Sequence, residues 1–146
     1  MRESFGGAFI IKLLLIFIIF YISFMAIAIN YSKAFRVKNR VINIIEQYQY
    51  DIYNVTDYDR VEEGFINPYL ESVAYRYYGK DYPRIQNDCD SYAGSRLTTN
   101  GACIVPLGAD DARYYKIITY IAINFPFFGI ELIIPISGET KIIQTS

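Results

Sequence analysis

Histidine is missing from this sequence of 146 residues. Catalytic triads with a histidine base and metal sites with histidine ligands are therefore excluded. The glycines form neither a G-x-G-x-x-G pattern nor a phosphate-binding P-loop. Asp88 and Asp90 could bind calcium, but no EF-hand loop follows them, and we interpret them as solvated turn residues. We therefore predict that the protein is not an enzyme and has no catalytic residue, metal, cofactor or small-molecule substrate.

An excess of charge of either sign is also missing. Lysine and arginine together number 14, aspartate and glutamate 15, and the formal net charge is −1. Such a balance predicts no nucleic-acid partner, because nucleic-acid-binding domains carry a clear positive excess.

Charged residues are almost absent from one long segment. Residues 8–29, AFIIKLLLIFIIFYISFMAIAI, include a single charged side chain, that of Lys12. About 20 apolar residues form a helix long enough to cross a bilayer. A helix of the same length can pack beside copies of itself in the dry core of a filament, so two uses stay open.

The helix is predicted to continue over residues 30–50 with a different pattern. Apolar residues recur there every three or four positions, whereas Lys33, Arg36, Lys38 and Arg40 fall on the other face. We expect the apolar stripe to lie against a C-terminal domain. The chain is therefore divided into a long helix, residues 1–50, and a small globular domain, residues 51–146.

The globular domain is predicted to contain an antiparallel sheet. Residues 102–107, 114–125, 130–136 and 141–145 are rich in β-branched and aromatic side chains, and Ser137-Gly138 is a tight-turn signal. Residues 79–99 show no period and are predicted to form an irregular loop. The predicted fold class is α+β, with a long N-terminal hydrophobic helix packed on a small C-terminal antiparallel sheet domain.

Two cysteines, Cys89 and Cys103, enclose a polar loop. A disulfide across about 15 residues would remove roughly 3 kcal/mol of loop entropy from the unfolded chain, and it would require an oxidising compartment. We predict this disulfide; the alternative is two unrelated free thiols. Asn54 begins an Asn-Val-Thr glycosylation acceptor and is a candidate glycosylation site.

The hydrophobic helix, its amphipathic extension and a small sheet with a cysteine-bounded loop together resemble the type IV pilins and related pilin-like proteins. The TadE-like proteins of tight-adherence systems are similar in outline. The resemblance covers the whole chain as architecture but only the N-terminal half as a motif. It implies a structural subunit that is inserted in the cytoplasmic membrane and then polymerises with itself into an extracellular, pilus-like filament at the cell surface. The helix residues expected to make those contacts are Phe9, Ile10, Leu13, Leu14, Phe17, Phe20, Tyr21 and Phe24.

A second interpretation is a single-pass membrane-anchored component of a secretion or tight-adherence assembly. The positive-inside rule, applied to Lys33, Arg36, Lys38 and Arg40, would keep the C-terminal domain in the cytoplasm. The predicted disulfide and the pilin-like plan favour export instead.

Three fates of the N-terminus compete. A signal peptidase would cleave after Ala26-Ile27-Ala28, although the apolar run is long for a signal core. A prepilin-type peptidase would cleave after Gly7, at the end of a short charged leader. The third fate is no cleavage, and we expect the helix to stay part of the working protein.

Lys12 departs from the pilin pattern. In that family the fifth mature residue is a glutamate that neutralises a neighbour's amino terminus, and cleavage after Gly7 would place Lys12 there with the opposite charge. Glu3 of the same chain lies about 13.5 Å away along the helix axis, too far for contact. We predict that Glu3 of a neighbouring subunit pairs with Lys12, the alternative being a lysine that snorkels to lipid headgroups.

Overall fold

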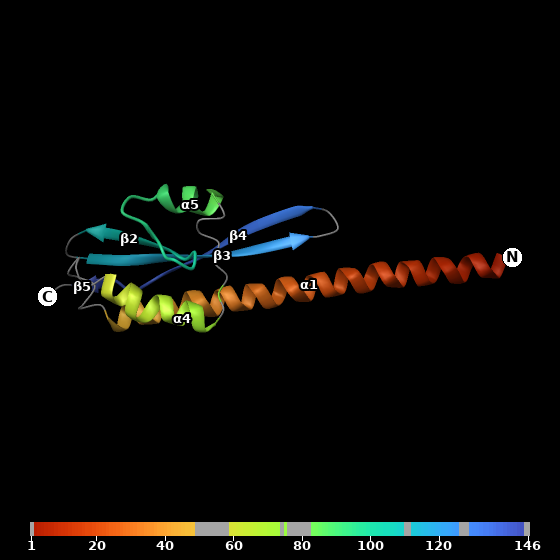
Figure 1. Ribbon diagram of the computed structural model, residues 1–146, viewed down its shortest axis with the longest axis horizontal. Helices are drawn as coiled ribbons and strands as arrows, with labels where there is room; N and C mark the ends of the chain where they lie inside the picture. The colour runs from red at the N-terminus through yellow and green to blue at the C-terminus, as the bar shows by residue number, and fades with distance from the viewer. Residues whose placement is uncertain are drawn as a thin grey trace. The chain divides into compact units, whose positions relative to one another are not determined.

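The computed structural model describes residues 2–48, 59–73, 75, 83–109, 112–125 and 129–144. The chain separates into two compact units, Met1–Ser32 and Lys33–Ser146. Helix α1, Arg2–Gln47, forms the described part of the first unit and is also the first element of the second (Figure 1). The predicted continuation of the apolar helix into the globular domain is therefore confirmed.

Among the described residues of the second unit, three further helical elements follow α1. They are the π-helical turn η1 (Glu62–Ile66), helix α4 (Asn67–Ser72) and helix α5 (Pro83–Asp90). Pro68 is the second residue of α4, directly after η1, and has no N–H to donate to the preceding helical turn. The Tyr48 and Phe65 rings stack with their centroids 4.3 Å apart, which joins the end of α1 to η1.

The strands of the second unit form one antiparallel sheet. Strands β1 (Arg96–Leu97), β2 (Cys103–Ala109), β3 (Ala112–Phe125) and β4 (Ile130–Glu139) lie side by side in that order, and β5 (Ile143–Gln144) pairs with the start of β3. The register sets Cys103 opposite Ile118 and Ile121 opposite Ile134. The predicted α+β fold is confirmed, since the domain part of α1 packs on this sheet.

Each face of the sheet has its own core because side chains alternate along a strand. Ile104 and Ile117 face the second half of α1, together with buried residues of η1 and α4. Cys103, Val105 and Ile118 belong to the other core, which α5 covers (Figure 1). The sheet is thus enclosed between helices on both faces.

Two predictions about loops are wrong. The region 79–99 is not irregular throughout, because α5 and β1 form within it; Ile85 and Cys89 of α5 are buried. Ser137-Gly138 is not a turn but lies inside β4. A Cβ added at Gly138 would come within 2.9 Å of the Lys38 Cδ atom, so the missing side chain makes room for α1 on the sheet.

The prediction that Lys38 lies on the polar face of α1 is also wrong. Lys38 is buried, only 8% exposed, and its Nζ lies 4.2 Å from the centre of the Phe35 ring. The buried stripe contains Val37, Val41 and Ile45, and Lys38 falls beside them in the helical period. The lysine is tolerated there because its aliphatic stem packs against the sheet while its ammonium rests on an aromatic face.

Candidate functional site

The most extensive exposed feature of the first unit is its apolar helix surface. All eight side chains predicted to make helix contacts are exposed, from 54% for Leu14 to 74% for Phe20. The residues of Gly6–Gln47 have the length and the composition of a helix that can cross a membrane, two properties that a signal sequence near an N-terminus shares. A surface of this kind is stable only in lipid or against another protein.

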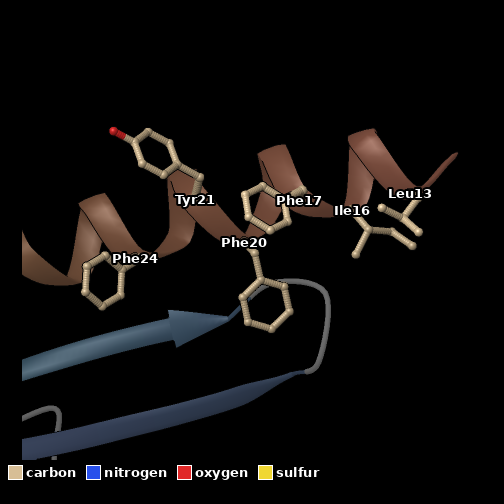
Figure 2. Close-up of a pocket in the computed structure, with 6 residues that line it drawn as sticks. All are labelled: Leu13, Ile16, Phe17, Phe20, Tyr21 and Phe24. Carbon is tan, nitrogen blue, oxygen red and sulfur yellow. The ribbon is translucent and has the colours of Figure 1, made fainter. Parts of the chain in front are cut away.

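Part of this surface forms a groove along the helix. Its lining side chains recur every three or four residues and are therefore neighbours on the helix; they are Leu13, Ile16, Phe17, Phe20, Tyr21 and Phe24. Figure 2 shows the phenylalanine rings following one another along α1, with the Tyr21 hydroxyl pointing away from the helix. The groove unites five of the predicted contact residues, whereas Phe9, Ile10 and Leu14 lie outside it. Sequence reasoning missed Ile16, although its spacing from Leu13 signals the same face.

Lys12 is the only charged residue between Gly6 and Ser32. Its side chain is exposed, and it does not line the groove. Glu3 belongs to the same helix, but its side chain lies outside what the structure describes. The pairing of these residues between subunits therefore stays a prediction, as does glycosylation of Asn54, which lies outside the described residues.

In the second unit, Cys89 and Cys103 form the predicted disulfide, with their Cα atoms 5.8 Å apart. It links α5 to the first residue of β2, and both cysteines are fully buried. The Ser95 hydroxyl donates a hydrogen bond of 2.5 Å to the Cys89 carbonyl. The cross-link therefore holds α5 on the face of the sheet that is opposite to α1.

Three titratable groups of the second unit have a pKa raised by burial, namely Glu62, Tyr115 and Tyr120. Burial, together with a hydrogen bond of 2.8 Å that the hydroxyl donates to Asp88, raises the pKa of Tyr120 well above its usual range. Burial also raises the pKa of Glu62, although Arg96, which forms an ion pair with Asp59, works in the opposite direction. Asp88 is thus a hydrogen-bond acceptor within the fold.

The described residues hold no group of three or more acidic or cysteine side chains that could bind a metal ion. Comparison with models of protein families, with curated proteins and with solved structures finds no match for the chain. The functional argument therefore depends on the apolar helix, the disulfide and the domain to which the helix is joined.

Proposed function

We propose that this protein is a pilin-like structural subunit that polymerises through its N-terminal helix into an extracellular, pilus-like filament. The observation that carries the proposal is the single helix α1, which exposes apolar side chains over residues 6–22 and becomes the core helix of a sheet domain from Ala34 onwards. Such a chain has an apolar helix surface that is unfavourable in water. It also has a domain whose hydrophobic core forms without that surface.

The groove on α1 supports association between helices. Helices pack when the side-chain ridges of one enter the grooves of the next, at interaxial distances of about 8–10 Å. The rings of Phe17, Phe20 and Phe24 can supply both ridge and groove in identical copies. Repetition of one such contact between copies of the chain generates a helical polymer when the rotation does not close into a ring.

The disulfide supports an extracellular domain. Disulfides persist in oxidising compartments and are rare where thiols are kept reduced. Cys89 and Cys103 are bonded and fully buried. The proposal thus places the helix in the membrane before assembly and the domain outside the cytoplasm.

Electron microscopy of material sheared from cells tests this function. Filaments that bind an antibody against the C-terminal domain, and that are absent from cells lacking the chain, would support it. Recovery of the chain in the membrane fraction alone would favour the second candidate, a single-pass anchored component of an assembly machine. A monodisperse monomer in every detergent-free buffer that dissolves the purified protein would contradict the filament.

A further inference from the structure

The second unit exposes a basic face on α1. Arg36, Asn39, Arg40 and Asn43 are all exposed, on the side of the helix that points away from the core residues Val41 and its neighbours. Arg36 and Arg40 are four residues apart, so their side chains leave the same side of the helix. Two guanidinium groups therefore project together beside amide side chains, and the first acid along this side of the helix is Glu46, three residues beyond Asn43, which accepts a hydrogen bond from the Lys141 N–H.

No carboxylate among the residues that the structure describes pairs with these two groups. The sequence contains no aspartate or glutamate from residue 4 to residue 45. Within the described part of the chain, neither Arg36 nor Arg40 takes part in an ion pair. The buried Lys38 differs, because its ammonium rests on the Phe35 ring. Among the described residues, the arginine pair is thus a positive charge at the surface without an acidic partner.

The position of the pair in the sequence indicates what neutralises it. Residues 8–29, at about 1.5 Å per residue, give about 33 Å of apolar helix, close to the thickness of a bilayer core. Arg36 follows Ile29 by seven residues, or about 10 Å of helix, whereas the headgroups extend only about 5–8 Å beyond the hydrocarbon. Helical side chains lean toward the N-terminus, so in a helix inserted as proposed the long side chain of Arg36 reaches back to the phosphates. Arg40, one turn further out, lies within about a Debye length of the anionic surface.

We propose that Arg36 and Arg40 bind the headgroups of anionic phospholipids in the leaflet from which the domain emerges. Guanidinium groups recognise phosphate through paired hydrogen bonds, and basic clusters beside a membrane span are attracted by an anionic surface. The exposed Phe35 ring, 43% accessible, lies beside Arg36 in the sequence and suits the same interfacial layer. The inference rests on the proposed membrane insertion of the helix but not on the filament.

This assignment also gives the basic residues after the span a role on the exported side. The positive-inside rule would place them in the cytoplasm. Binding to anionic headgroups instead holds the domain close to the outer surface of the membrane until the helix leaves the bilayer. Detachment from lipid is then part of the free-energy cost of polymerisation.

A single tryptophan can report which lipids surround this face, because the chain contains none. The substitution Ser32→Trp places the reporter four residues before Arg36, on the same side of the helix. The full chain is reconstituted into vesicles made of equal parts of phosphatidylglycerol and phosphatidylcholine, with either one of the two lipids brominated. The ratio of the two quenching efficiencies measures local enrichment of the anionic lipid.

We expect enrichment of phosphatidylglycerol on the order of fivefold, the ratio that corresponds to the attraction of one basic residue to an anionic surface. The Arg36→Gln/Arg40→Gln variant should bring the ratio close to one, and high salt should lower it. The matched control is Arg60→Gln/Arg84→Gln, which removes two other exposed arginines and likewise changes the net charge from −1 to −3. That control should keep the enrichment.

Four results would overturn the proposal. Equal quenching by both lipids would show that the pair does not select anionic lipid. An unchanged quenching ratio in the Arg36→Gln/Arg40→Gln variant would show the same. Neither result would contradict membrane insertion. Loss of enrichment on addition of inorganic phosphate, at constant ionic strength, would assign the pair to a free anion. Quenching by neither lipid would refute insertion itself, and with it the proposed function.

Discussion

At the scale of single residues, Tyr75 completes the sheet where β2 begins. β2 starts at Cys103, opposite Ile118, so Tyr120, two residues further along β3, has no β2 partner. The Tyr120 N–H donates to the Tyr75 hydroxyl at 2.9 Å, and that hydroxyl donates to the Tyr120 carbonyl at 3.0 Å. Both backbone groups are buried and would otherwise be unsatisfied.

Tyr75→Phe is therefore expected to lower the free energy of unfolding by about 1–3 kcal/mol, the cost of leaving buried polar groups without partners. Chemical denaturation of the full chain in non-ionic detergent, followed by circular dichroism, measures the change. Tyr114→Phe is the control, since its hydroxyl forms no hydrogen bond with the residues described. Equal stability of the two variants would show that the Tyr75 hydroxyl contributes nothing.

Glu62 makes stability depend on pH. Burial raises its pKa in the folded state, so the folded protein holds this proton more tightly than the unfolded chain does. The tighter binding of this proton contributes to the free energy of unfolding. That contribution is present below the usual glutamate pKa of 4.5 and is lost as the pH rises above the raised pKa of the folded state. Glu62→Gln should thus stabilise the domain at neutral pH and have little effect in acid.

Glu63→Gln provides the control for this pH dependence. Glu63 is the adjacent carboxylate and is exposed. Urea denaturation of both variants and of the natural chain, from acid to neutral pH, separates burial of Glu62 from a general charge effect. The burial argument fails if Glu63→Gln changes the pH profile as strongly as Glu62→Gln.

At the scale of elements, close contact between α1 and β4 depends on Gly138. An added Cβ would lie 2.9 Å from Lys38 Cδ and 3.0 Å from Ile42 Cδ1. Both atoms lie toward the ends of flexible side chains, but Lys38 is buried, so the helix side chains must shift to make room for the added Cβ.

Gly138→Ala is expected to destabilise the domain by about 1 kcal/mol or more, as overpacking of a core does. Gly64→Ala is the matched control, because nothing lies within 4 Å of a Cβ at that position. Thermal unfolding of the two variants under the same conditions tests the prediction. A Gly138→Ala protein as stable as Gly64→Ala would mean that α1 adjusts its position at no cost.

The disulfide fastens a short helix that has little to hold it otherwise. Helix α5 is eight residues long and buries only Ile85 and Cys89. Replacing both cysteines by serine should lower the free energy of unfolding by about 2–4 kcal/mol, mainly by releasing the unfolded chain. Denaturation of the oxidised chain, the reduced chain and the double variant measures this difference.

Mass spectrometry of unreduced protein from the cell surface provides a second check on the disulfide. Cys89 and Cys103 should be found linked in that material. Free thiols at both positions would contradict both the bond and the oxidising compartment inferred from it.

At the scale of the whole molecule, assembly is predicted to depend on Lys12 and Glu3 of neighbouring copies. A charge without a partner in an apolar environment is costly, so Lys12→Leu and Glu3→Gln should each reduce filament yield. The double variant should lose less than the sum of the two single losses, because the partners are coupled. Filament released per cell measures all three variants.

Charge reversal provides the control for this pair. Glu3→Lys and Lys12→Glu should each abolish most filaments, and their combination should restore part of the yield. Independent and additive effects would reject the pair and favour a lysine that reaches headgroups instead.

Local sequence patterns were sufficient to predict the long helix and the long strands. A long apolar run without proline, followed by apolar residues every three or four positions, is typical of a helix, so α1 could be predicted over nearly its whole length. The strands β3 and β4 were predicted because they are rich in β-branched and aromatic residues. The cysteine pair could be predicted from spacing and composition. The helix contacts of the first unit stay a prediction.

Tertiary structure decided what local patterns left ambiguous. Helix α5 is polar and short, and it exists because Ile85 and the disulfide hold it on the sheet. Ser137-Gly138 has the composition of a turn, yet it continues β4 because α1 requires the space above Gly138. Lys38 has a polar side chain in a buried stripe, which Phe35 makes tolerable. For α5 and for Ser137-Gly138 the deciding contact joins residues far apart in the chain, which local sequence patterns do not reveal. For Lys38 it is burial against the sheet, to which the neighbouring Phe35 ring adapts the ammonium.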